Sequence, residues 1–508
     1  MLAFICKKSA ESNRAKPLAQ DMKSTDPLLD AWLETLRCAK DGPAILNTDG
    51  EVLRKFSDVE ERACHFESNL KMFAPGSVIA IQIGNHEDWP SILIACLRNR
   101  LVVLPLEQSI SGQQRDAALK VCGATALVSA VSNGGSAEIF GLRPSKDREQ
   151  AADATTDWAE KAPTLLKLTS GTTAAPRAIR FGSQQLLADC NQICDSMGIS
   201  DADLNFGVIP ISHSYGFSNL LTPLIVRGVP MVVSRDRTPR AVLADLARTD
   251  ATVFPGTPIF YQAFCDMHDV PALRQLRLCI CAGAPLSGTV AKKFFEKFKL
   301  LIHSFYGASE CGGICYDRDG TAFEDGVVGE PLKNVDVEII DPAAPSSQIR
   351  VRSAGVGDGY FPEPDEQKLA NGIFVPDDLL ARTERGFKIV GRISDVINIA
   401  GKKVNPGEVE AHIIGFPGIK QAVVFGRPAA AGALRNEEVA ACVVADADLR
   451  ENNLLELCRK TLSPWQVPKR IFIVDAIPTN ERGKISRRDL ARRFSANQTS
   501  SSLPTLGA

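Results

Sequence analysis

Short apolar runs alternate with amphipathic segments in the first third of the chain. The pattern predicts strands at residues 77–83, 101–104 and 124–128, separated by helices at residues 87–98 and 113–122. Strands of four to seven mostly apolar residues that alternate with helices are typical of βαβ units. The sequence therefore predicts an α/β fold whose sheets are mostly parallel.

The same alternation resumes in the middle of the chain. The predicted elements are a helix at 184–197, strands at 206–211, 231–233, 251–254 and 279–281, and a helix at 239–249. Residues 143–161 are charged and poor in large apolar side chains, so they are interpreted as a connection. Residues 355–359 superficially match a dinucleotide-binding loop, but Tyr360-Phe361-Pro362 follows in place of a helix, and a turn is predicted there.

The pattern changes near Gly391, after which the segments are shorter. Helices are predicted at 406–414 and 452–462, and strands at 421–426, 439–445 and 470–474. These elements suit a compact α+β unit of about 100 residues. The prediction is thus a large N-terminal domain of βαβ-built sheets flanked by helices, at residues 27–390, followed by a small C-terminal domain at residues 396–495. Residues 1–26 and 496–508 are expected to be a disordered extension and a disordered tail.

Composition narrows the function classes. The chain has 508 residues, of which 44% are hydrophobic and 23% charged, and its net charge is −2. These values are typical of a soluble globular protein and argue against nucleic acid as the main partner. No uninterrupted apolar stretch reaches membrane-spanning length. The 14 cysteines have no paired or zinc-type spacing, which favours reduced thiols and a cytoplasmic location.

A run of small hydroxylated residues is the first candidate site. Thr169, Ser170, Gly171, Thr172 and Thr173 are consecutive, and Arg177 follows them. Backbone N–H and side-chain O–H groups of such a loop can converge on an anion, which suits a triphosphate. The loop is no Walker A motif, and a polar surface loop is the alternative interpretation.

Four further stretches carry groups that suit a nucleotide. Tyr306, with Gly307, Ser309 and Glu310 after it, could stack on a base and offer an oxygen to a magnesium–phosphate complex. Asp378, read as lying at the end of a strand, could accept hydrogen bonds from a ribose diol. The alternatives are an ordinary turn and a solvated acidic turn.

The other two stretches lie in the last quarter of the chain. Arg392 is a candidate ribose or phosphate contact, and Gly401 opens a basic turn before a helix. Lys484 lies on a glycine turn from which a cation could stabilise charge on two reacting oxygens. A charged loop and a solvated basic helix are the alternatives.

In their order and spacing these five motifs resemble the adenylate-forming superfamily. That superfamily includes acyl- and aryl-CoA synthetases, the adenylation domains of peptide synthetases and luciferases. The resemblance covers roughly residues 30–495. It implies that a carboxylic acid reacts with ATP to give an acyl-adenylate and pyrophosphate. A thiol then displaces AMP; the thiol belongs to CoA or to a carrier protein's pantetheine.

The resemblance also implies a role for each candidate residue. Residues 169–173 and Arg177 would hold the β- and γ-phosphates, and Ser309 would touch the α-phosphate. Tyr306 would stack near adenine beside Gly307, and Asp378 and Arg392 would hold the ribose. Glu310 would bind Mg²⁺, and Lys484 would bridge the carboxylate and the α-phosphate. His213 would gate the acid pocket. The C-terminal domain would be mobile about a hinge at 391–395, presenting Lys484 for adenylation and the Gly401 loop for thioester formation.

Several positions depart from the family pattern. Ser214 cannot pair with an α-ammonium group, which disfavours an α-amino acid. Phe305 should shorten the pocket and favour a compact acid over a long fatty tail. Ala174, Arg177, Asp377 and Ser394 replace the Gly, Lys, Gly and Asp or Lys that are usual.

The leading hypothesis is therefore an ATP- and Mg²⁺-dependent acyl- or aryl-CoA ligase. A free-standing enzyme that loads a carrier protein is the alternative within the class. A non-catalytic nucleotide-binding relative, weakened at Ala174 and Arg177, is the alternative from another class.

Overall fold

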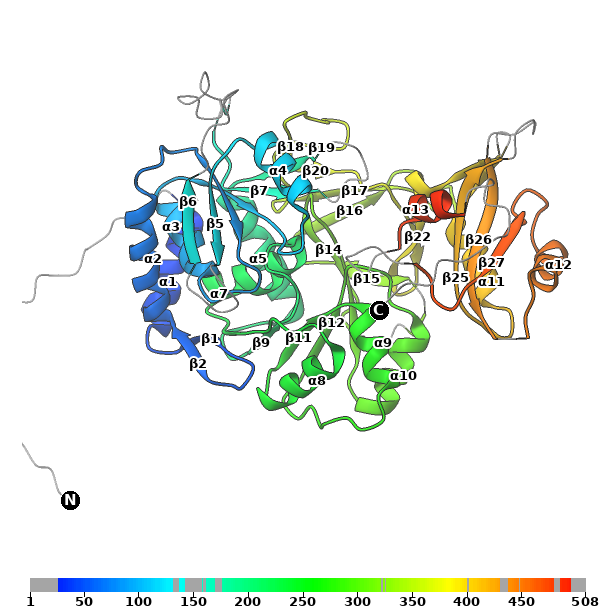
Figure 1. Ribbon diagram of the computed structural model, residues 1–508, viewed down its shortest axis with the longest axis horizontal. Coiled ribbons are helices and arrows are strands. Elements are labelled where there is room, and N and C mark those ends of the chain that lie inside the picture. The colour runs from blue at the N-terminus through cyan, green and yellow to red at the C-terminus, as the bar shows by residue number, and fades with distance from the viewer. Residues whose placement is uncertain are drawn as a thin grey trace, which may run out of the picture.

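The computed structural model describes residues 26–130, 137–141, 158, 161–169, 176–320, 323–324, 326–399, 402–429, 437–446, 448–478 and 485–494. They form a larger body and a smaller lobe at one end of it (Figure 1). The hydrophobic clusters divide in the same way. The clusters of the body contain residues between Leu28 and Phe387, and those of the lobe contain residues between Ile397 and Leu490. The division falls in the interval where the hinge is predicted, and the predicted domain boundaries stay predictions.

One sheet of the body has seven strands. Its order is β18 (Gly359–Phe361), β8 (Ala178–Phe181), β7 (Leu165–Leu168), β4 (Val102–Pro105), β3 (Val78–Gln82), β5 (Ala124–Ala130) and β6 (Ala137–Gly141). The central strands β7, β4, β3 and β5 are parallel, and the outer pairs are antiparallel. The parallel centre confirms the βαβ prediction.

A second sheet of eleven strands crosses the body. Its order is β2 (Val52–Lys55), β1 (Pro43–Leu46), β10 (Met231–Val233), β9 (Asn205–Gly207), β11 (Val253–Gly256), β12 (Leu278–Cys281), β13 (Ile302–Ala308), β14 (Gly312–Tyr316), β15 (Val327–Pro331), β22 (Gly386–Arg392) and β21 (Asp378–Thr383). It is parallel from β1 to β13 and antiparallel from β13 onward. A four-stranded sheet adjoins it: β16 (Val335–Ile339), β17 (Ile349–Ser353), β20 (Ile373–Phe374) and β19 (Leu369–Ala370).

Helices pack on these sheets. They are α1 (Pro27–Ala39), α2 (Phe56–Leu70), α3 (Trp89–Arg98), α4 (Gly112–Val121), α5 (Ser183–Met197), α6 (Ser214–Gly216), α7 (Thr222–Arg227), α8 (Pro239–Arg248), α9 (Pro258–Asp266) and α10 (Gly288–Phe298), with a π-helical segment at Phe217–Leu221. Local chemistry sets their ends: Asp26 accepts hydrogen bonds from the N–H groups of Leu28 and Leu29 at the start of α1. Gly198, in the left-handed region, ends α5.

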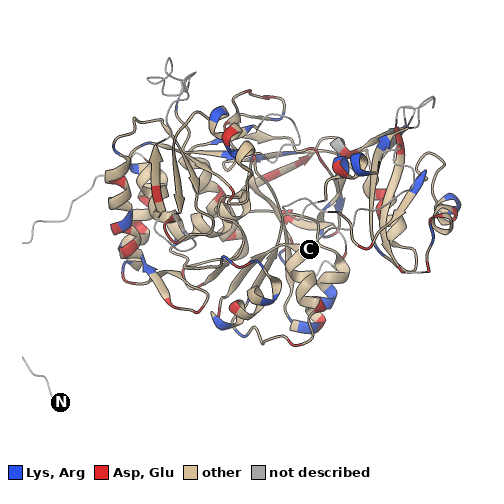
Figure 2. Cartoon of the chain, in the orientation of Figure 1, with Lys and Arg blue, Asp and Glu red and all other residues tan. Residues whose placement is uncertain are grey.

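The smaller lobe contains β23 (Ile397–Ile399), β24 (Lys402–Val404), α11 (Pro406–Ile414), β25 (Ile419–Pro428), β26 (Glu437–Ala445), α12 (Glu451–Thr461), β27 (Arg470–Ile473) and α13 (Arg487–Arg493). Strands β25, β26 and β27 form one sheet. This mixture confirms the predicted α+β unit. Acidic and basic residues are interspersed over both parts rather than separated by sign (Figure 2). Within the described helices, no segment is both long enough and apolar enough to span a bilayer.

Some sequence predictions need correction. The strand predicted at 206–211 stops at Gly207, because the Asn85 side chain then binds the backbone N–H of Ile211. The strand predicted at 251–254 begins only at Val253. Asp378 opens β21 and does not end a strand. The predicted turn near 355–359 is confirmed: Val356 N–H donates to the carbonyl of Ser353. Most of the predicted connection 143–161 lies outside the described residues.

Candidate active site

The turn between β13 and β14 carries the central carboxylate of the site. Tyr306 and Gly307 lie in β13, and Ser309 and Glu310 lie in the turn that follows. The Glu310 carboxylate accepts a hydrogen bond of 3.0 Å from the Tyr360 hydroxyl. Burial raises the pKa of Glu310 above its usual value, and the Tyr360 hydrogen bond offsets only part of that rise. Glu310 is therefore an acidic group held where its negative charge is poorly solvated.

A second carboxylate lies between an aromatic and a basic residue. Asp378 and Arg392 are paired across β21 and β22, and the Arg392 Nε donates to Asp378 at 2.6 Å. The Tyr306 hydroxyl donates to the other carboxylate oxygen at 2.7 Å. Burial and the neighbouring Asp378 charge raise the pKa of Tyr306 well above its usual value, so this hydroxyl stays protonated. The structure thus joins three predicted nucleotide contacts, Tyr306, Asp378 and Arg392, in one hydrogen-bonded chain.

Arg177 connects the phosphate-loop candidate to Glu310. The guanidinium lies over the Tyr360 ring, 4.2 Å from its centroid, and donates to the Glu363 carbonyl at 3.0 Å. Thr169 donates to the Arg177 carbonyl through both its N–H, at 2.9 Å, and its hydroxyl, at 3.2 Å. The base of the loop is closed by these bonds. Ser170, Gly171, Thr172, Thr173 and Ala174 lie outside the described residues.

His213 and its neighbours lie on the other side of the turn. The His213 ring caps α6 by accepting the Tyr215 N–H at 3.3 Å. The Ser214 hydroxyl donates to the Ser309 hydroxyl at 3.0 Å. Phe305 is buried, with its ring centroid 6.0 Å from that of Tyr215. The segment predicted to line the acid pocket thus contacts the residue predicted to touch the α-phosphate.

Other predicted residues are placed only in part. Lys484 and Gly401 lie outside the described residues, and the side chain of Ser394 is likewise not described. Asp377, the carboxylate next to Asp378, bonds to the Lys368 ammonium at 2.7 and 2.9 Å. The two adjacent carboxylates therefore coexist because each has its own cation.

Four residues near this site were not predicted from the sequence: Tyr360, Lys368, Lys167 and Asp189. Tyr360 carries no local signal, because its partner Glu310 lies 50 positions away along the chain, and the separation of nine positions between Lys368 and Asp377 matches no helix-face spacing. Lys167 could have been found, since it is the one charged residue of the apolar, buried strand β7, whereas Asp189 lies in α5 among other polar residues and carries no such signal. Buried charges are rare unless they are paired.

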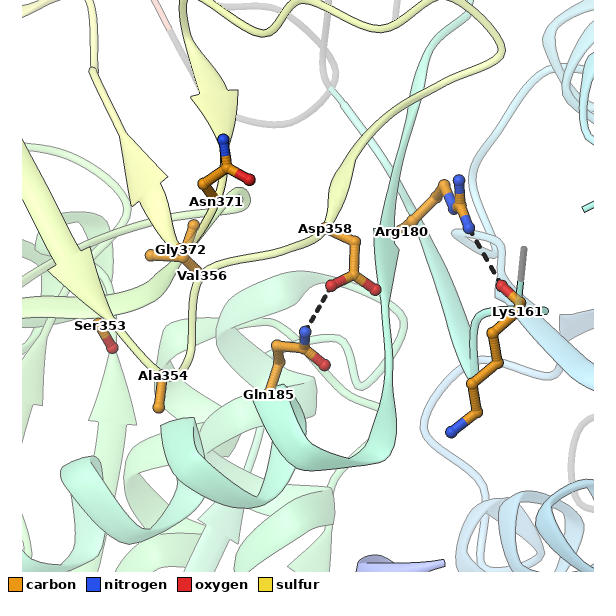
Figure 3. A pocket seen from close by; sticks show the side chains of 9 residues that line it. All are labelled: Lys161, Arg180, Gln185, Ser353, Ala354, Val356, Asp358, Asn371 and Gly372. Carbon is orange, nitrogen blue, oxygen red and sulfur yellow. Dashed lines mark hydrogen bonds between the residues drawn. The ribbon is translucent and has the colours of Figure 1, made fainter. Parts of the chain in front are cut away.

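A cavity of about 440 Å³ lies beside the site (Figure 3). Asp358 and Gln185 face one another in it and form a hydrogen bond of 2.6 Å. Arg180 donates to the carbonyl of Lys161 at 3.1 Å on the opposite side. None of the predicted site residues lines this cavity, so it is distinct from the Glu310–Asp378 cluster.

The resemblance implies a magnesium site. Among the described residues, no group of three or more His, Cys, Asp or Glu side chains could hold a metal ion alone. Mg²⁺ commonly binds one or two carboxylates together with water and substrate phosphates. Glu310 fits that chemistry, because a bound cation would compensate the poorly solvated charge of its carboxylate.

Two family models match this chain, one after the other along its length. The model described as AMP-binding enzyme matches residues 35–361, and the model described as AMP-binding enzyme C-terminal domain matches residues 408–484. The first covers more than half of the chain.

Individual relatives and structures are more distant. A probable CoA ligase of Humulus lupulus is 26% identical over 479 residues, covering 85% of this chain and 90% of the relative. A feruloyl-CoA synthase of Amycolatopsis is 26% identical over 464 residues, covering 86% and 94%. The crystal structure of ATP-bound MatB from Rhodopseudomonas palustris superposes with a TM-score of 0.76 at 22% identity, covering 92% of this chain and 99% of that one. This last likeness establishes the fold.

Proposed function

Because the chain belongs to the AMP-binding enzyme family, we infer that it is an AMP-forming acid–thiol ligase of the acyl-CoA synthetase type. In the first half-reaction a carboxylate oxygen of the acid attacks the α-phosphorus of ATP, and pyrophosphate leaves. In the second, the CoA sulfur attacks the carbonyl carbon of the acyl-adenylate, and AMP leaves. The observation that carries the proposal is the convergence of Glu310, Asp378 and Arg392, whose charges come from separate segments, around β13 and its turn.

The proposed roles follow the contacts of each side chain. Asp378 can accept hydrogen bonds from the ribose, because the bonds from Arg392 and Tyr306 hold its carboxylate in one orientation. The Tyr306 ring borders the place proposed for adenine. Arg177, with residues 169–173, is proposed to bind the β- and γ-phosphates, and Ser309 the α-phosphate.

Glu310 is proposed to hold Mg²⁺, which when bound neutralises part of the triphosphate charge. The carboxylate position is set by the Tyr360 hydroxyl, and Arg177 stacks on the same tyrosine ring. These contacts would keep the metal-binding carboxylate and a phosphate-binding cation at a constant separation.

The acid is proposed to be compact and to lack an α-amino group. Ser214 offers a hydroxyl that is engaged with Ser309, and no charge for an ammonium group. Phe305 adds a buried ring beside Tyr215, which supports a short pocket. His213 is proposed to border the acid.

Acid-dependent exchange of pyrophosphate into ATP tests the first half-reaction. A panel of short aliphatic, dicarboxylic and aromatic acids should contain at least one that supports exchange in the presence of Mg²⁺. The absence of exchange with every acid, together with ATP binding, would favour the non-catalytic alternative.

The proposed role of Lys484 is tested by replacement with alanine. Lys484→Ala should reduce exchange by roughly 100-fold or more, because a cation at the reacting oxygens is lost. The matched control is Lys460→Ala, which removes an exposed lysine from α12 and should leave exchange unchanged. Equal rates for Lys484→Ala and wild type would contradict the proposal.

The thiol acceptor is proposed to be CoA, as in the relatives named above. CoA and a holo carrier protein offered in competition separate this from the carrier-loading alternative. Acyl-CoA should be the main product; exclusive acylation of the carrier would select the alternative.

A further inference from the structure

Two oppositely charged side chains are buried beneath the proposed active site. Lys167, in β7, is 5% exposed, and Asp189, in α5, is 3% exposed. The Lys167 ammonium lies 4.5 Å from the centroid of the Phe181 ring and 5.7 Å from that of Phe217. Burial lowers the pKa of Lys167, and the Asp189 carboxylate is the strongest of the negative groups that oppose this change. An interior ion is tolerated when an opposite charge accompanies it.

Asp189 holds the turn that carries Glu310. The backbone N–H of Gly313 donates to the Asp189 carboxylate at 3.0 Å. Gly312 has a φ of +71°, and a Cβ atom there would overlap the same carboxylate. Glycine at position 312 therefore lets the Asp189 carboxylate approach the backbone more closely than any other residue type would allow. The carboxylate contacts the turn on the side where β14 begins.

The opposite side of the turn is held by the segment between β17 and β18. Gly357 N–H donates to the carbonyl of Glu310 at 2.9 Å. A Cβ atom at Gly355 would lie 3.3 Å from the Asp189 Cβ and 3.4 Å from the Cys311 carbonyl oxygen. Glu310 is thus fixed through its backbone between this segment and Asp189.

Lys167 is also close in sequence to the phosphate-loop candidate. It lies two residues before Thr169, where the phosphate-loop candidate begins. Glu310 and the Cys311 thiol are, with Asp189, the negative or ionisable groups that act on its ammonium. These groups offset part of the lowering that burial imposes on the pKa of Lys167.

We propose that Asp189, together with the buried cation Lys167, positions Glu310: Asp189 holds the turn between β13 and β14 so that the Glu310 carboxylate faces the magnesium–triphosphate complex, and Lys167 supplies the opposite charge in the interior. The inference rests on the proposed function. It goes further, because it predicts that these two buried residues affect the Mg²⁺ concentration that the enzyme requires. Residues that served stability alone would leave that concentration unchanged.

The test compares Lys167→Met, Asp189→Asn and the double variant. The Mg²⁺ concentration for half-maximal exchange should rise about tenfold in each single variant, with the KM for the acid unchanged. The double variant should still require more Mg²⁺ than the wild type, but by less than the product of the two single effects, because neither charge is left without its partner. Lys167→Arg, which retains the charge, should restore magnesium dependence at least partly.

A second readout does not depend on activity. The thermal midpoint of the wild type should rise more with ATP plus Mg²⁺ than with ATP plus a chelator, and this difference should shrink in the single variants. Asp203→Asn is the matched control, because Asp203 is equally buried and pairs with Arg277 before strands β9 and β12, away from the turn. It should lower the midpoint and leave the magnesium-dependent difference unchanged.

The outcomes separate the two proposals. A wild type with neither exchange nor a magnesium-dependent shift contradicts the proposed function. An active wild type with unaltered magnesium dependence in Lys167→Met, Asp189→Asn or the double variant overturns the positioning role. If a single variant does not fold, the double variant, which buries no net charge, decides the question.

Discussion

At the scale of single residues, the site keeps two carboxylates in contrasting surroundings. Asp378 accepts from Arg392 and Tyr306, so two donors stabilise its charge. Glu310 accepts from Tyr360, and burial raises its pKa. These surroundings suit different tasks. Asp378 is suited to bind the two neutral hydroxyl groups of a ribose, and Glu310 is suited to bind a cation, which would compensate its poorly solvated negative charge.

Glu310→Gln should expose this difference. The folded-state pKa of Glu310 is above its unfolded value, so the ionised carboxylate costs stability above the folded pKa, and the cost disappears as pH falls through that range. At pH 7 without metal, Glu310→Gln should therefore raise the thermal midpoint. The same change should lower magnesium-dependent exchange by roughly 100-fold.

The measurement is a pair of melting curves at pH 7 and near pH 4, alongside exchange assays. The stabilising effect should be present at pH 7 and diminish at the lower pH. A variant less stable than wild type at pH 7 would show that the carboxylate is already compensated without metal.

At the scale of elements, the hairpin formed by β13 and β14 depends on one backbone conformation. Gly312 combines a positive φ with close approach to Asp189. Gly307, whose register partner is Gly313, has no room for a side chain either, because a Cβ atom there would lie 2.6 Å from the Gly312 carbonyl oxygen. The turn is therefore determined by packing from α5 and from the segment before β18, in addition to its own residues.

Gly312→Ala should consequently lower the free energy of unfolding by more than the strain of a positive φ alone explains. Gly50→Ala is the matched control, because Gly50 has a φ of +84° and no atom lies within 4 Å of its Cβ position. The control should cost about 1 kcal/mol in free energy of unfolding. Gly312→Ala should cost at least about 2 kcal/mol more, since the added methyl must displace the Asp189 carboxylate.

Chemical denaturation measures the free energy of unfolding of each variant, and ATP binding shows whether the proposed active site is still intact. Equal destabilisation by the two changes would mean that the Asp189 contact relaxes without cost.

At the scale of the whole molecule, Arg487 ties the start of α13 to the junction of the two parts. Its guanidinium contacts Asp395 at 2.6 Å and Glu410 at 2.9 Å, and donates to the Val424 carbonyl at 3.0 Å. Asp395 lies at the predicted hinge, and Lys484 is three residues before Arg487. Arg487 thus holds the start of α13 against the predicted hinge, three positions after Lys484 in the sequence.

Arg487→Ala should reduce pyrophosphate exchange about tenfold, because the segment that presents Lys484 loses its anchor and Glu410 loses its partner. Thioester formation from added acyl-adenylate and CoA should fall less, since that step is proposed to use the Gly401 loop. Arg492→Ala, on the same helix but in an exposed pair with Asp489, is the control and should have little effect on either step. Equal losses in both half-reactions would contradict a specific link to Lys484.

Much of the architecture was predictable from local patterns. The helices α3, α4, α5, α8, α11 and α12 and the parallel strands β3, β4, β5, β10 and β12 agree with their predicted positions, because apolar periodicity is a property of each segment. The antiparallel strands from β14 to β22 were not predicted. Their short, irregular segments become strands through pairing with distant partners.

The sequence by itself determined the family of this protein and the charged and hydroxylated residues of its proposed site. The order and spacing of these motifs can be read from the chain without knowing which residues are in contact. Only the tertiary structure decided how those residues are held: that Tyr360 donates to Glu310, that Lys368 pairs with Asp377, and that Asp189 grips the turn. Tyr360 and Glu310 are 50 positions apart in the chain and Asp189 and Gly313 are 124 apart, while Lys368 and Asp377 are nine apart. Hydrogen bonds and charge pairing act over a few ångströms in space, so only the fold reveals them.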